Sequence, residues 1–275
     1  MKKKSLIGLG VTLIALGVVT AALLISAHRQ GFTFGRTKVA FTFDDGTADH
    51  YAVAAPVLEK YGYRGVFSIV TGKVGTKGYM TWDQVKDLGS RGHVISLHTR
   101  DHENLGKLFK ANQLKKIMYQ IAEAKGDLSK NAGIEAKYLC FPFGSHNREL
   151  DEIVRSYGLE PIVVDRIDLG GGGGGSNPML NVGEFLNDIG KSFLKSQYVL
   201  MFHVVNDAAG YAAYGDDGGK FETVVRNIKL HDGEWYDVVN YDDNEWELED
   251  KSAPRLKRRA ERLKSVLQEK GWCVK

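Results

Sequence analysis

Two patterns of hydrophobic residues alternate along the chain from Lys38 onwards. Short apolar runs are typical of buried strands, and stretches in which apolar residues recur every three or four positions are typical of helices. The predicted strands cover residues 39–43, 65–70, 93–97, 138–141, 161–164 and 198–202. The predicted helices cover residues 52–61, 81–89 (or on to 92), 113–132, 150–157 and 254–271. Strands that alternate with helices favour βαβ units and a mainly parallel sheet or barrel.

Local signals mark the ends of several of these helices. Thr81 is followed three residues later by Gln84, which is the spacing of a capping box at a helix start. Gly62 and Gly158 come directly after the last periodic residues of two predicted helices, where glycine commonly ends a helix.

The N-terminal segment has the pattern of a membrane anchor. Residues 1–4 carry three lysines and are followed by residues 5–27, which contain no charge. A helix of this length spans roughly the 30 Å hydrocarbon core of a bilayer. A cleaved secretory signal is the competing interpretation. In both interpretations the lysines stay in the cytoplasm and the polar tether 28–37, with all that follows, lies outside; cleavage would make the protein secreted rather than anchored.

Length and composition indicate one globular domain of ordinary size over residues 38–275. Hydrophobic residues make up 43% of the chain and charged residues 26%, which is globular composition. The net charge of +3 is too balanced to indicate a nucleic-acid partner. Residues 204–253 are rich in Gly, Asp, Tyr and Trp and read as an insertion, and residues 170–175 are six glycines that read as a flexible loop. The sequence leaves the oligomeric state open.

The cysteine count limits the kinds of site. Only Cys140 and Cys273 occur, which excludes a disulfide-stapled scaffold and a four-cysteine zinc module. An extracytoplasmic domain permits disulfides, but whether these two form one stays open.

Three predicted strands end in residues that suit a divalent metal. Asp44 and Asp45 follow the first strand, His98 follows the third, and His203 follows the strand 198–202. In parallel α/β barrels the catalytic residues lie at the carboxyl ends of strands, because the loops there converge. His98 and His102 are four residues apart and can face one ion together with a carboxylate from another strand, which leaves positions open for water and substrate.

The motifs resemble those of the polysaccharide deacetylases, the NodB-type fold of carbohydrate esterase family four. Thr42-Phe43-Asp44-Asp45-Gly46 matches the first motif of the family, and His98-Thr99-Arg100-Asp101-His102 resembles the second, H-[ST]-x-x-H. Phe141-Pro142-Phe143-Gly144 is similar to the third motif and Met201-Phe202-His203 to the last. The resemblance implies a distorted (β/α) barrel and a metal-dependent hydrolase that removes N-acetyl groups from N-acetylglucosamine-containing polysaccharides. Together with the N-terminal segment, we expect one transmembrane helix before this barrel and a substrate outside the membrane.

The resemblance also implies roles for individual residues. Asp45, His98 and His102 would hold the metal, most often zinc in this family, with cobalt or nickel possible. Asp44 would be the general base and His203 the general acid. Pro142, Phe143 and Gly144 would bind the oxyanion or the substrate. Asp165 would be the acidic partner of His203.

One departure from the family pattern leaves other functions open. Cys140 stands where the family often has an arginine that orients the base, a task for which a thiol is unsuited; Arg148 or Arg166 could substitute. The alternatives are an O-acetyl esterase acting on a polysaccharide and a catalytically weakened sugar-binding relative. A non-haem iron oxygenase also uses two histidines and a carboxylate, but its fold would require many short antiparallel strands.

Overall fold

The computed structural model describes residues 37–162, 197–203, 205, 220–233 and 236–243 of the chain. Several predicted features lie outside these residues: the membrane segment 5–27, the glycine run 170–175, Asp165, the helix 254–271 and Cys273. Within the described ranges, no helix is both long and apolar enough to cross a membrane.

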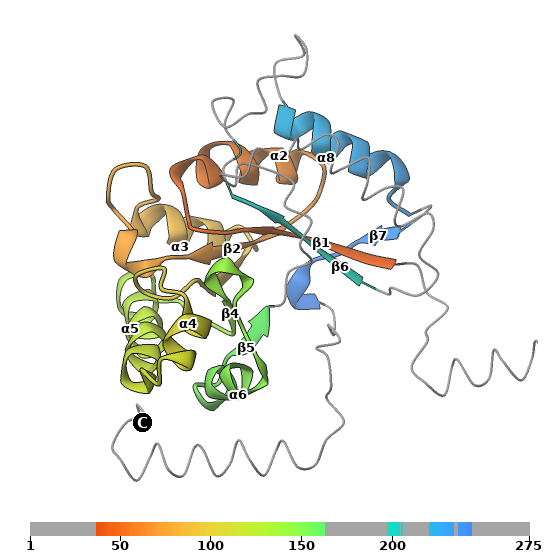
Figure 1. Cartoon of the computed structure of the whole chain (residues 1–275). Helices are drawn as coiled ribbons and strands as arrows, with labels where there is room; N and C mark the ends of the chain where they lie inside the picture. The colour runs from red at the N-terminus through yellow and green to blue at the C-terminus, as the bar shows by residue number, and fades with distance from the viewer. Residues whose placement is uncertain (1–36, 163–196, 204, 206–219, 234–235, 244–275) are drawn as a thin grey trace, which may run out of the picture.

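A seven-stranded sheet forms the centre of the fold, and every strand pairing in it is parallel. The strand order is β5-β4-β3-β2-β1-β6, and β7 also pairs with β1. The sheet curls into a half-barrel (Figure 1), which confirms the predicted α/β class. The strands are β1 (Thr37–Phe43), β2 (Gly65–Ile69), β3 (Val94–Leu97), β4 (Tyr138–Cys140), β5 (Glu160–Ile162), β6 (Gln197–Phe202) and β7 (Tyr236–Val238).

Helices and short helical turns connect these strands. The α-helices are α2 (Ala55–Lys60), α3 (Trp82–Ser90), α4 (Leu105–Lys110), α5 (Leu114–Ala132), α6 (Arg148–Ser156) and α8 (Lys220–His231). A π-helix, η1 (His50–Ala54), precedes α2, and the 3₁₀ turns are η2 (Thr71–Lys73), η3 (Pro142–Gly144) and η6 (Tyr241–Asp243). The predicted capping box is present at α3, because the Thr81 side chain accepts from the Gln84 N–H and the Gln84 side chain accepts from the Thr81 N–H.

The alternation of side chains along the strands separates two layers of core. On β1, Val39, Phe41 and Phe43 pack in a large cluster with the helices, whereas Ala40 belongs to a smaller cluster with Val66, Cys140, Ile162 and Val199. Since successive strand residues point to opposite faces, the smaller cluster lines the inner, concave face. Thr42 and the residue that follows the strand in the same alternation, Asp44, therefore belong to the inner face.

The segment predicted as an insertion, residues 204–253, differs from that expectation where the structure describes it. Helix α8 packs beside α2 (Figure 1) and buries four apolar side chains in the main core, namely Phe221, Val224, Val225 and Ile228. Strand β7 pairs with the N-terminal half of β1, along the edge that β2 occupies further on. Strand β7 is therefore part of the sheet, and helix α8 is part of the layer that covers it.

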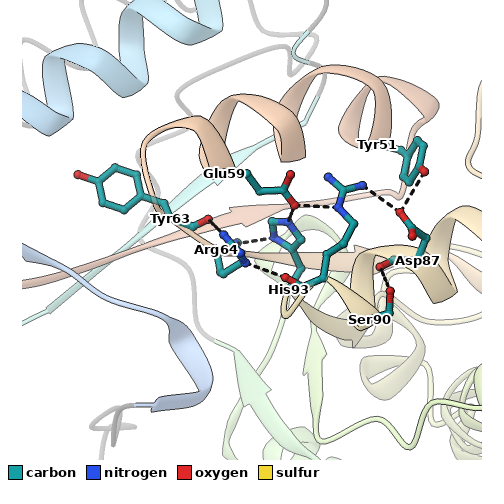
Figure 2. Close-up of polar contacts among 9 residues, drawn as sticks. Tyr51, Glu59, Tyr63, Arg64, Asp87, Ser90 and His93 are labelled. Atoms are coloured by element: carbon teal, nitrogen blue, oxygen red, sulfur yellow. Dashed lines mark hydrogen bonds and ion pairs between the residues drawn. The ribbon is translucent and has the colours of Figure 1, made fainter.

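A network of polar side chains ties α2 and α3 together at the amino ends of β2 and β3 (Figure 2). Arg91 donates to Glu59 at 2.8 Å and to Asp87 at 3.0 Å, and Tyr51 also donates to Asp87 at 3.0 Å. His93 is buried beneath them. Its Nδ1 accepts from the Gly65 N–H at 3.1 Å, and its Nε2 lies 3.0 Å from Glu59 Oε1.

The two contacts of His93 fix its tautomer. Because an N–H can only donate, Nδ1 is unprotonated and Nε2–H donates to Glu59. Burial lowers the pKa of His93, and the Glu59 carboxylate opposes this shift only in part. The nearby guanidinium groups of Arg64 and Arg91 act in the same direction as burial. The folded protein therefore keeps this imidazole neutral at pH values where the unfolded chain protonates it.

This network predicts a pH dependence of stability. Because the folded-state pKa of His93 lies below its unfolded value of 6.5, stability falls as the pH drops from about 6.5 towards the folded-state pKa. One such group contributes at most about 1.4 kcal/mol per pH unit. We expect His93→Gln, whose side-chain amide keeps an N–H donor for Glu59 and does not titrate, to lose less stability between pH 7.5 and pH 5 than wild type in urea unfolding. An equal loss of stability in wild type and His93→Gln would show that His93 is not the source of the pH dependence.

Candidate active site

The candidate site lies at the carboxyl ends of the strands, at the edge of the sheet opposite the network around His93. Asp44 follows β1, His98 follows β3 and His203 follows β6. The register pairs Phe43 with Phe202, so the residues that come next, Asp44 and His203, leave neighbouring strands at the same level. The Asp44 N–H also donates to the Phe202 carbonyl oxygen at 2.9 Å. Parallel pairing thus collects residues that are distant in sequence.

Asp45, His98 and His102 form a possible metal site. One ligand atom of each lies within 4.8 Å of the others. Asp45 Oδ1 is 3.1 Å from His102 Nε2 and 3.8 Å from His98 Nε2. This oxygen is buried, and no hydrogen bond to it occurs among the described residues. A buried carboxylate oxygen that faces two imidazole nitrogens without a hydrogen bond fits a cation between them.

The protonation states of the two histidines also fit a metal. His98 Nδ1 lies 2.9 Å from the carbonyl oxygen of Cys140. Since a carbonyl only accepts, Nδ1 carries the proton and, in the neutral ring, Nε2 keeps its lone pair. Burial, followed by the neighbouring His98, lowers the pKa of His102 to about 4. At neutral pH the His102 ring is therefore uncharged and able to act as a ligand.

Asp44 is buried beside this set, with 2% of its surface exposed. Its Oδ1 accepts from the Thr42 hydroxyl at 3.4 Å and its Oδ2 from the Cys140 thiol at 3.4 Å. The thiol at position 140, which was expected to be unsuited to orienting Asp44, thus contacts the carboxylate directly. Burial, followed by the charge of Asp44, raises the pKa of Cys140, which keeps its proton available for donation.

A second set of potential ligands overlaps the first. Asp44, His98 and Cys140 also bring one ligand atom each within 4.8 Å of one another. In this set, however, the thiol donates to Asp44 and the Cys140 carbonyl accepts from His98. These hydrogen bonds link the Asp45–His98–His102 set, through His98 and Cys140, to Asp44. Of the proposed arginine substitutes, Arg148 begins helix α6, and Arg166 lies outside the described residues.

Two residues that the sequence did not single out for the site hold the segment after β6. His50 Nε2 contacts the carbonyl oxygen of His203, and Asp49 Oδ2 accepts from the Val205 N–H at 2.6 Å. His50 is buried, with its ring at the edge of Phe43. The π-helix η1 places His50 there, and the sequence carries no local signal for that irregular turn.

Backbone strain is concentrated at this edge of the sheet. Four of the five non-glycine residues with positive φ in the described part of the chain are Asp45 (80°), Thr99 (63°), His102 (62°) and Phe143 (63°). Such conformations persist only where surrounding contacts enforce them, and they cluster at functional sites. The turn that aims both aspartates at the site therefore begins at Asp45 itself and continues through Gly46, which has φ of 77°.

Phe143 lies at the mouth of the site. It follows Pro142 in the turn η3, before Gly144, and 67% of its surface is exposed. Its ring centroid is 4.7 Å from that of His102. The third motif is thus brought next to the second. Asp165, the predicted partner of His203, lies outside the described residues.

Comparison with known proteins agrees with the motifs. The family model described as polysaccharide deacetylase matches residues 33–162. The chain is 32% identical over 111 residues to YxkH of Bacillus subtilis (strain 168), a protein provisionally named a polysaccharide deacetylase. That alignment covers 40% of this chain and 38% of the relative, so the chain spans well under half the length of this curated relative.

Solved structures share the fold over most of the chain. The structure titled T48 deacetylase with substrate superposes with a TM-score of 0.55 at 21% identity, covering 75% of this chain and 89% of that one. The Bc1960 peptidoglycan N-acetylglucosamine deacetylase gives 0.58 at 18% identity, with 77% and 89% covered. The peptidoglycan deacetylase PdaC from Bacillus subtilis gives 0.56 at 16% identity, with 86% and 98% covered. These likenesses show a common fold, and the family model described as polysaccharide deacetylase matches this chain over residues 33–162.

Proposed function

We propose that the protein is a metal-dependent hydrolase that removes N-acetyl groups from an N-acetylglucosamine-containing polysaccharide outside the membrane. The observation that carries this proposal is the placement of Asp44 directly beside the Asp45–His98–His102 set. A carboxylate that can accept a proton thus lies next to three residues suited to one cation. Metal-assisted hydrolysis of an amide uses both of these features.

The proposed metal ligands are Asp45, His98 and His102. One carboxylate and two neutral imidazoles suit Zn²⁺, and cobalt or nickel can occupy such nitrogen and oxygen sites as well. Three protein ligands leave a further position open, as in catalytic zinc sites. When bound, a divalent ion supplies Lewis acidity towards the acetyl carbonyl and makes water easier to deprotonate.

The protein residues supply the proton transfers and the oxyanion contacts. Asp44 takes a proton from the attacking water at its carboxylate, which Thr42 and Cys140 hold in place. His203, which leaves β6 beside Asp44, donates a proton to the departing amine nitrogen, because an unprotonated amine is a poor leaving group. The backbone N–H of Phe143, supported by Pro142 and Gly144, donates to the developing oxyanion. Asp165 completes the proposal as the partner of His203.

The proposed substrate is a β-linked N-acetylglucosamine polymer of the cell envelope or surface. Two of the similar structures, Bc1960 and PdaC, are named as peptidoglycan deacetylases. The apolar segment 5–27 supports an anchored, extracytoplasmic enzyme, or a secreted one if that segment is cleaved. Such an enzyme meets envelope polymers directly.

The activity is tested by acetate release from N-acetylglucosamine oligomers, using the full chain loaded with Zn²⁺, Co²⁺ or Ni²⁺. We expect release by wild type, and a loss of about 10²-fold or more in kcat for Asp44→Asn, since general-base catalysis contributes about that much. Asp83→Asn, at an exposed position in the first turn of α3, is the matched control and should keep full activity.

Two other outcomes of the same assay are informative. Release of acetate from acetylated xylan but not from the amide oligomers would assign the O-acetyl esterase activity instead. Binding of the oligomers without turnover, by folded and metal-loaded wild type, would refute the hydrolase proposal and favour a sugar-binding relative.

The ligand assignment is tested by measuring bound zinc in wild type, His98→Ala and His146→Ala. We expect His98→Ala to lose about 100-fold or more in zinc affinity, because even outer partners of a ligand typically contribute 10–100-fold. His146 pairs with Asp151 at 3.1 Å and provides the histidine control, which should retain zinc. Equal zinc in wild type and His98→Ala would remove the proposed site.

The contact between Cys140 and Asp44 predicts a split between two substitutions. Cys140→Ala removes the donor and should lower kcat by about 2–10-fold with little change in KM, which corresponds to one hydrogen bond of about 0.5–1.5 kcal/mol. Cys140→Ser keeps a donor and should retain more activity than the alanine variant. Zinc content is measured alongside, and equal kcat in the alanine variant and wild type would show that the contact does not position the base.

A further inference from the structure

Helix α5 holds the segment between the two proposed histidine ligands. The Arg100 N–H donates to the carbonyl oxygen of Gln120 at 3.1 Å. The Asp101 N–H donates to Gln120 Oε1 at 2.8 Å, and Gln120 Nε2 donates to Asp101 Oδ2 at 2.8 Å. One residue of α5 thus makes three hydrogen bonds to the two residues that directly precede His102.

The position of Gln120 within α5 is otherwise apolar. Gln120 is 1% exposed, and its buried neighbours on the helix are Ile117, Ile121 and Ala124. A buried amide is costly unless it is hydrogen-bonded, and here both ends of the amide are used by Asp101. Core packing alone would favour an apolar side chain at this position. The glutamine is therefore explained by its hydrogen bonds to Asp101.

Residues 99–102 need such contacts because their backbone is strained at both ends. Thr99 and His102 have φ values of 63° and 62°, a left-handed conformation that costs non-glycine residues free energy. Without contacts that enforce these angles, residues 99–102 would relax. The imidazole of His102 would then move relative to Asp45 and His98.

The exit of β2 holds the other side of the same segment. The Gly72 N–H donates to the Arg100 carbonyl oxygen at 2.8 Å, and a Cβ at position 72 would lie only 2.7 Å from that oxygen. Arg100 itself lies against Asp101 at 3.1 Å and against Asp127 of α5 at 3.5 Å. The 99–102 segment is therefore clamped between β2 and α5, and Gln120 provides the largest share of the bonds from the helix.

We propose that Gln120 is a positioning residue that sets the orientation of His102 in the metal set by holding Asp101. This inference rests on the proposed function only in taking His102 as a metal ligand. Gln120 acts through Asp101 and the backbone and does not contact the reacting atoms.

The test uses Gln120→Met in the full chain. Methionine conserves volume and helix propensity but makes no hydrogen bond to Asp101, so α5 should stay packed. We expect zinc affinity, measured by competition with a chromophoric chelator, to fall by about 10-fold, the lower end of the effect of losing an outer partner of a metal ligand, because Gln120 acts on His102 through Asp101. We also expect the visible absorption bands of the Co²⁺-loaded variant to shift, because these bands report ligand geometry.

Gln113→Met is the matched control. Gln113 is exposed at the start of the same helix, and its side chain makes no capping hydrogen bond. This variant should bind zinc and Co²⁺ as wild type does.

Asp101→Ala is a second test variant, because it removes the carboxylate that Gln120 contacts at a solvent-exposed position. It should also weaken zinc binding, which keeps the proposal testable if Gln120→Met does not fold. The losses of Asp101→Ala and Gln120→Met should be less than additive in the double variant, since both remove the hydrogen bond from Gln120 Nε2 to Asp101 Oδ2.

The outcomes separate this inference from the proposed function. Folded Gln120→Met or Asp101→Ala with wild-type zinc affinity and wild-type Co²⁺ spectra would overturn the positioning role while leaving the hydrolase proposal intact. Wild type that binds no metal and releases no acetate would overturn the proposed function, and the positioning role with it.

Discussion

The hydrogen bond from His98 to the carbonyl oxygen of Cys140 joins β3 to β4 at the edge where the site lies. Because the carbonyl can only accept, it fixes the tautomer of His98 and leaves Nε2 for the side of Asp45. The same cysteine donates its thiol to Asp44. One residue at the end of β4 therefore contacts a proposed metal ligand through its backbone and the proposed base through its side chain, so a substitution at position 140 changes the contact to the base and keeps the carbonyl that faces His98.

The contacts of Asp44 explain how the site accommodates a cysteine where relatives often have an arginine. Thr42 and Cys140 are neutral donors, and both contacts are long, at 3.4 Å. They restrict the direction of the carboxylate without placing a positive charge beside it. The high pKa of the buried thiol has a consequence here, because only a protonated sulfur can donate to the carboxylate.

Much of the fold and of the candidate site followed from the sequence, for a physical reason. Short apolar runs and helical spacing predicted β1 to β4, α3 and α5, and parallel strands place Asp45 and His98 at one edge of the sheet. The parts that the sequence missed are short or depend on distant contacts. Helix α4 has six residues, too few for a periodic signal, and β7 has three residues whose place depends on pairing with β1. The left-handed backbone at Thr99 and His102 has no signature in residue type, and so the clamp by Gln120 was not foreseen either.

The two ends of the sheet have different energetic roles. At the amino ends, His93, Glu59 and Arg91 satisfy one another in a closed network, with the histidine held neutral. At the carboxyl ends, the structure has left-handed backbone at four non-glycine residues and a buried Asp45 oxygen with no hydrogen bond from the described residues. Strain of this kind persists only when surrounding structure over-determines it. The bonds from α5 and from the exit of β2 supply that constraint next to the strained residues.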